Sequence, residues 1–102
     1  MILEIELENL IEINNKIFNN LTKSYINAKE DEKDKIYNER WKFIHKYADE
    51  MNTFIWNNKT DLTPNITILF DSIPNTVWKR MYEKSAEIIK VINEYYSKKQ
   101  EK

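Results

Sequence analysis

The chain has 102 residues, of which 41% are hydrophobic and 32% are charged, with a formal net charge of -1; this size predicts one domain, 1–102, with a modest core. The absence of cysteine excludes disulfide scaffolds, thiolate zinc sites and cysteine nucleophiles, and the absence of glycine argues against glycine-rich phosphate loops and tight β-hairpins. The near balance of 16 basic and 17 acidic residues argues against a nucleic-acid or anionic membrane partner.

No part of the sequence is apolar over the ~20 residues that a membrane-spanning helix needs. The first residues do not resemble a secretory signal, because acidic side chains interrupt their apolar run. We therefore expect a cytoplasmic protein, in its own cell or in the cytoplasm of a host, with no membrane partner. The abundance of Asn, Lys and Ile indicates an AT-rich genome, which fits a phage or another mobile element as well as many bacterial chromosomes.

The first predicted helix runs from Leu3 to Lys29. Its apolar residues recur at alternating steps of four and three, which places them on one coiled-coil-like face. Asn14 occupies an a-type position in this stripe, where a buried amide would fix the register of the helices. The charged run 29–35 that follows is predicted to be the turn. Another face carries an acidic ridge, Glu4, Glu8 and Glu12. We interpret this ridge as a solvated face, and the functional alternative is a docking surface for a basic partner.

The second predicted helix, from Glu32 to Trp56, has the strongest periodic signal. Its first apolar stripe repeats without a gap and consists of Tyr37, Trp41, Ile44, Ala48, Met51 and Ile55. Its second stripe consists of Ile36, Phe43, Tyr47 and Phe54. Together the stripes cover more than half of the helix circumference, which is more than one bundle seam requires. Either this helix is central and packs on both sides, or the second stripe, with Trp56, contacts a partner protein.

The segment 57–74 is predicted to hold one short helix, from Pro64 to Asp71. Thr63 is a suitable N-cap, and proline is favoured at the first helical position. The alternative is a β-strand over Ile66–Phe70, because these residues favour strands. We prefer the helix, since no partner strand is visible elsewhere in the sequence.

A third long helix is predicted from Asn75 to Lys98, with Trp78, Met81, Ile88 and Ile92 on its apolar face. A weak similarity between segments 38–55 and 75–92 leaves an internal duplication open. The predicted fold class is therefore all-α: an elongated antiparallel bundle of three long helices plus one short helix in the 57–74 segment.

Candidate catalytic chemistry is limited to His45, the single histidine, with Asp49 one helical turn further on. The pair could form a base with an orienting carboxylate, or part of a metal site. Both uses need further groups that the pattern does not supply, so a solvated ion pair is the preferred interpretation. We expect no catalytic residue, no metal and no cofactor.

The sequence thus favours a non-enzymatic protein–protein interaction module, a helical bundle that self-associates, as a dimer, or docks on a host protein. By analogy of size and class, an inhibitor or immunity-type factor of a mobile element fits this description. Its predicted interface residues are Ile36, Phe43, Tyr47, Phe54 and Trp56. The alternative is a small nucleic-acid-binding accessory protein that uses the basic start of the third helix: Lys79, Arg80 and Lys84.

Overall fold

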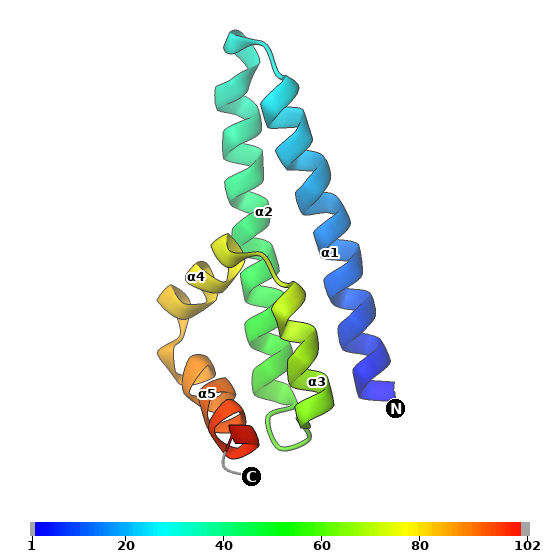
Figure 1. Ribbon diagram of the computed structural model, residues 1–102. Helices are drawn as coiled ribbons and strands as arrows, with labels where there is room; N and C mark the ends of the chain where they lie inside the picture. The colour runs from blue at the N-terminus through cyan, green and yellow to red at the C-terminus, as the bar shows by residue number, and fades with distance from the viewer. Residues whose placement is uncertain (1, 101–102) are drawn as a thin grey trace.

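The computed structural model describes residues 2–100 and consists of helices joined by short loops (Figure 1). In chain order these are α1 (Ile2–Asn27), α2 (Glu30–Asn57), α3 (Pro64–Leu69), the 3-10 helix η1 (Phe70–Ser72), α4 (Asn75–Lys84) and α5 (Ala86–Gln100). No β-strand occurs among the described residues, so the all-α prediction is confirmed and the alternative strand at Ile66–Phe70 is wrong. That segment is the predicted short helix, and Thr63 Oγ1 accepts a hydrogen bond from Ile66 N at its start.

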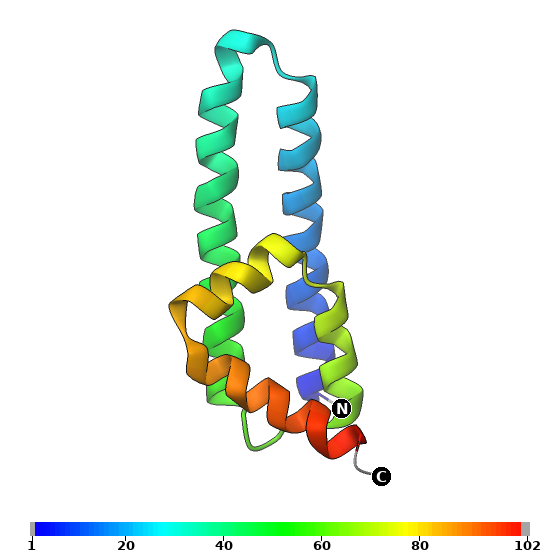
Figure 2. The ribbon, with the colours of Figure 1, turned by 60° about the vertical axis from the view of Figure 1, so that its left-hand side comes forward.

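The two long helices α1 and α2 run antiparallel and side by side as a hairpin (Figures 1 and 2). Only Ala28 and Lys29 connect them, so α2 begins inside the charged run that was predicted to be the turn. The first turn of α2 carries three acidic residues, whose charge complements the positive end of the helix dipole and favours this early start. The Lys29 carbonyl accepts hydrogen bonds from the backbone N–H groups of Glu32 and Lys33, which closes the turn.

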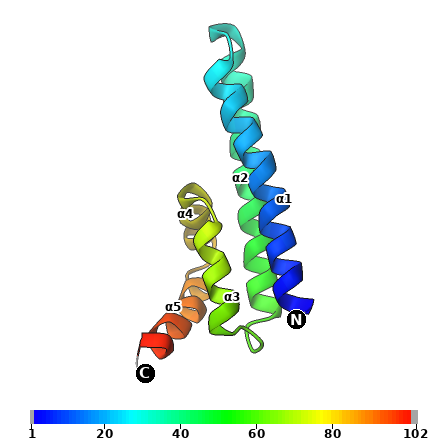
Figure 3. The same cartoon turned by 45° about the vertical axis from the view of Figure 1, so that its right-hand side comes forward.

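The remaining helices, α3, η1, α4 and α5, form what we call the cap. The cap lies on one side of the hairpin and covers only the half that contains the N-terminus (Figures 2 and 3). Hairpin and cap share one core, which includes Leu7, Ile11, Ile44, Ala48, Met51 and Ile55 from the hairpin and Ile66, Phe70, Val77, Met81, Ile88 and Ile92 from the cap. The molecule is elongated, 53 × 26 × 23 Å, because the hairpin extends well beyond the cap.

The prediction of a third long helix is wrong, because the chain bends at Ser85 and forms α4 and α5 instead. Ser85 has an extended backbone, with φ -155° and ψ 101°, although its N–H still bonds to the Met81 carbonyl. Val77 and Met81 are buried before the bend, and Ile88 and Ile92 are buried after it. The bend lets α4 pack on α2 while α5 packs on α3, which a straight helix of that length could not do. The described molecule is therefore a long hairpin with a compact cap rather than a bundle of three long helices.

Candidate functional site

The second apolar stripe of α2, predicted as a partner interface, is the seam with α1. Tyr47 is fully buried, and its hydroxyl donates to Asn15 Oδ1 at 2.8 Å. Two further bonds cross the same seam, from Asn14 Nδ2 to Glu50 Oε2 at 3.0 Å and from Arg40 Nε to Thr22 Oγ1 at 3.1 Å. Positions 36, 40, 43, 47, 50 and 54 follow steps of three and four, so they share one helical face. Helix α2 is therefore central and packs on α1 with one face and on α4 with the other.

This arrangement corrects the predicted interface residue by residue. Tyr47 belongs to the core, so it cannot contact a partner in this conformation. Phe43 and Phe54 are partly buried and pack against the core, and Ile36 is also partly buried. Trp56 is 46% exposed, but Lys59 Nζ lies 3.5 Å from its ring centroid and covers one ring face. The second stripe therefore exposes only parts of separate side chains and forms no continuous apolar surface.

Tyr47 and Asn15 form the polar centre of the seam. Burial and then the nearby Glu50 carboxylate raise the pKa of the Tyr47 hydroxyl well above its usual range, so it remains a hydrogen-bond donor at neutral pH. Asn15 also donates through Nδ2 to the Ser72 carbonyl at 2.9 Å, which ties α1 to η1. These contacts have a structural role, since they hold α1, α2 and the cap in register.

The predicted basic cluster is largely neutralised by acidic neighbours. Lys84 Nζ lies 2.6 Å from Asp49 Oδ1 on α2, and Arg80 Nη1 lies 2.7 Å from Glu83 Oε2. Lys79 is exposed on α4. Two of the three cations thus already have a carboxylate partner, which weakens the cluster as a phosphate-binding patch.

His45 and Asp49 do not form a base with an orienting carboxylate. Asp49 pairs with Lys84, and the His45 ring lies against Trp41 with 6.2 Å between centroids. Among the residues that the structure describes, no three His, Asp or Glu side chains come close enough together to hold a metal ion. His45 and Asp49 therefore make separate structural contacts, with Trp41 and with Lys84.

A row of aromatic rings continues the first stripe of α2 beyond the cap. We define the aromatic strip as Tyr25 from α1 and Tyr37, Trp41 and His45 from α2. The centroid distances are 6.1 Å from Tyr25 to Tyr37, 6.2 Å from Tyr37 to Trp41 and 6.2 Å from Trp41 to His45. Tyr37 is 45% exposed, whereas the residues next along the same stripe, Ile44, Ala48 and Met51, are completely buried.

Two rings of the aromatic strip, Tyr25 and Trp41, carry a cation over one face. Lys33 Nζ lies 5.5 Å from the Tyr25 centroid near the hairpin tip. The Arg80 guanidinium, from α4, lies 5.2 Å from the Trp41 centroid at the edge of the cap. These contacts fix the orientation of the Tyr25 and Trp41 rings. The sequence pattern placed Tyr37 and Trp41 on one apolar stripe. Only the folded chain shows how far the cap covers this stripe.

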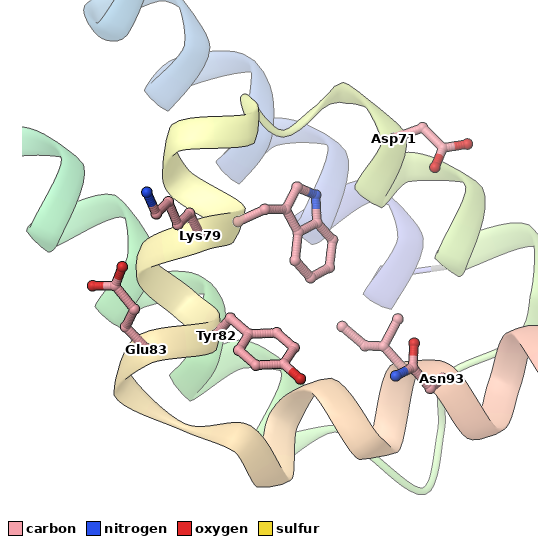
Figure 4. Close-up of a pocket in the computed structure, with 7 residues that line it drawn as sticks. Asp71, Lys79, Tyr82, Glu83 and Asn93 are labelled. Atoms are coloured by element: carbon pink, nitrogen blue, oxygen red, sulfur yellow. The ribbon is translucent and has the colours of Figure 1, made fainter.

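A second surface feature is a groove at the bend between α4 and α5 (Figure 4). Its volume is about 640 Å³, and it is lined by Asp71, Trp78, Lys79, Tyr82, Glu83, Ile92 and Asn93. Trp78 is fixed there, because its Nε1 donates to the Phe70 carbonyl at 3.1 Å. Tyr82 is 58% exposed and points toward α5. The groove is large enough for an apolar side chain or a small aromatic molecule. The sequence pattern could not predict it, because it depends on the bend.

Within residues 2–100, no helix combines the length and the apolar character that crossing a membrane requires. Comparison of the chain with protein-family models, with curated proteins and with solved structures finds no match.

Proposed function

We propose that this chain is a non-enzymatic protein-interaction module whose binding surface is the aromatic strip on the uncovered half of the hairpin. One observation carries the proposal: a single stripe of α2 is completely buried in the half of the hairpin that the cap covers, whereas in the other half Tyr37 is 45% exposed and Trp41 is only partly buried. By analogy of size and class, such a module would act in the cytoplasm as an inhibitor or immunity-type factor of a mobile element.

The chemistry of the strip suits a protein partner. Tyr, Trp and Arg are the residues that most often dominate binding energy at protein interfaces, because they bury a large area with few rotatable bonds. Tyr37 and Trp41 meet nearly edge to face, with an interplanar angle of 74°, so each ring is already positioned by the other. We therefore place the interface at Tyr37 and Trp41, at the partly exposed end of the first stripe of α2, and not on the second stripe as the sequence pattern predicted.

Nucleic-acid binding is the weaker alternative. Aromatic side chains beside Arg and Lys can stack on bases. Here, however, Glu30 and Asp34 fall on the same helical face as Tyr37 and Trp41, and they would repel phosphates. Glu83 also occupies one donor group of Arg80. These charges favour a protein surface over a nucleic acid.

Site-specific photo-crosslinking in the cell that expresses the chain tests this proposal. A photoreactive residue at position 37 should give discrete protein adducts. The same residue at Lys42, which is exposed about 140° around α2 from Tyr37, should not. Equal adducts at both positions, or none at position 37, would contradict the proposal. An adduct with nucleic acid would favour the alternative.

A further inference from the structure

We infer that the occupant of the aromatic strip is a second copy of this chain, bound antiparallel so that two uncovered hairpin halves form a four-helix arrangement. This inference rests on the proposed function and names the partner. Three observations support it: the shape of the uncovered half, the charges at the two ends of the strip, and the length available for contact.

In the covered half of the hairpin, each long helix has a further helix packed against it. There, α3 packs against α1 and α4 packs against α2, so two further helices complete the layer on one side of the hairpin. The uncovered half presents the same two helices, α1 and α2, without those neighbours (Figure 2). A second hairpin offers two helices side by side, which is the number of neighbours that the uncovered half lacks.

The charges along the strip select the antiparallel orientation. Positions 30, 34, 37, 41 and 45 of α2 follow steps of four and three, so they lie on one face. Glu30 and Asp34 make the tip end of this face acidic, although Lys33 lies beside them. The cap end carries Arg80, with Lys79 on the same helix and Glu83 bound to one guanidinium nitrogen. An antiparallel pair places each acidic tip against the other copy's Arg80, whereas a parallel pair would place like charges together.

Within one chain, the acidic tip and the cap end are separated along α2. Asp34 precedes Trp41 by seven residues, which is about 10 Å along the helix axis. Because Arg80 covers Trp41 in the same chain, its guanidinium lies too far from Asp34 for a direct ion pair. In the antiparallel dimer the symmetry axis falls near Tyr37, and each Arg80 reaches the partner's tip. Arg80 donates one bond to Glu83 and has further N–H groups for a second carboxylate.

The length of the uncovered face predicts a reversible dimer. From Glu30 to Trp41, where Arg80 of the cap begins to cover α2, this face spans about 17 Å, and two helices side by side are about 20 Å wide. That face buries roughly 350 Å² per copy, below the ~800 Å² that is usual for stable complexes. We therefore expect association on the order of micromolar affinity rather than a permanent dimer.

Sedimentation equilibrium of the full chain across micromolar concentrations tests this inference. The unmodified chain should show a monomer–dimer equilibrium. Tyr37→Glu, at the centre of the overlap, should weaken the dimer about tenfold or more. Ile13→Ser is the matched control: Ile13 is 60% exposed but lies about 120° around α1 from Tyr25, so this variant should leave the dimer unchanged. Loss of the dimer in Ile13→Ser but not in Tyr37→Glu would assign the interface to the opposite side of the hairpin and overturn the inference.

Charge reversal tests the orientation. A chain with Glu30→Lys and Asp34→Lys and a second chain with Arg80→Glu should each associate about tenfold more weakly than the unmodified chain. Mixed together, they should recover association, because both ends of the heterodimer are then complementary. The weakening of each variant alone identifies the antiparallel orientation, since a parallel pair of unmodified chains already places like charges together. No recovery in the mixture, with both variants showing unchanged circular dichroism, would rule out the antiparallel pairing. If Arg80→Glu does not fold, Tyr37→Glu still decides whether the strip is the interface.

The outcomes separate this inference from the proposed function. A chain that stays monomeric at hundreds of micromolar overturns the second copy as occupant. A crosslink from position 37 to a different protein would still support the interaction module in that case. Absence of both the dimer and the crosslink would remove both proposals.

Discussion

The two halves of the α1–α2 hairpin differ in what covers them rather than in their amphipathic pattern. In the half near the N-terminus, the cap seals Ile44, Ala48 and Met51 completely. In the half near the turn, Tyr37 and Trp41 continue the same stripe, and Tyr37 is 45% exposed while Trp41 is partly buried. The same helical signal therefore produces a buried core in one half and a partly exposed aromatic surface in the other, which we propose as the binding surface. The comparison predicts that substitutions in the covered half destabilise the fold, whereas those in the open half affect association.

The largest expected effect is on a core residue of the covered half. Met51→Ala removes a side chain that is fully buried at the centre of the core. We expect it to lower the free energy of unfolding by about 3 kcal/mol, because lost burial and a new cavity add together. Urea denaturation followed by circular dichroism measures this change. A loss no larger than that of an exposed substitution would mean that the cap does not seal this half.

Tyr47→Phe addresses the seam that both halves share. It removes the hydroxyl that donates to Asn15 and leaves that acceptor without this bond, at a cost of about 1 kcal/mol. The pKa of the Tyr47 hydroxyl is raised in the folded state, so the protonated form is the one that folding favours. Its contribution is therefore fully present below the unfolded pKa of about 10 and is lost as the pH rises toward the folded pKa. The variant should lose less stability than the unmodified chain above about pH 10. An equal loss of stability with rising pH in both proteins would show that the Tyr47 hydroxyl does not cause this pH dependence.

The ion pair between Lys84 and Asp49 connects cap and hairpin, and we expect it to contribute little. The Asp49 side chain is largely exposed, so solvent screens the interaction. A double-mutant cycle with Lys84→Ala and Asp49→Ala should give a coupling of about 0.5 kcal/mol or less, decreasing with added salt. A coupling several times larger would show that charge, and not apolar burial, holds the cap in place.

The smallest effect on stability is expected in the open half. Tyr37→Ser should change the free energy of unfolding of the dilute monomer by less than about 0.5 kcal/mol, because nearly half of this residue is already exposed. Urea denaturation at low protein concentration isolates this value from dimerisation. A cost comparable to that of Met51→Ala would show that the strip belongs to the fold, and the contrast between the two halves would then disappear.

The helices themselves could be read from the sequence because helix formation depends on near neighbours. The apolar period predicted α1 and α2 to within two residues at each end, and Thr63 with Pro64 marked the start of α3. The bend at Ser85 was missed, since the apolar period of α4 continues into α5 without a change in step. Serine is an ordinary helix residue in that context. What favours the bend is the position of α2 and α3, which no local pattern contains.

The amino-acid pattern thus determined which residues share a face, and it showed that α2 has two apolar faces. Only the tertiary structure decided which helix covers each face and where that cover stops. Tyr47 became a core residue because Asn15, 32 positions away in sequence, lies opposite it. Tyr37 stayed 45% exposed because it lies in the half of α2 near the turn, and the cap covers only the other half of the hairpin. Periodicity follows from hydrogen bonds between residues four apart, whereas burial depends on contacts between distant segments, and these arise only when the whole chain folds.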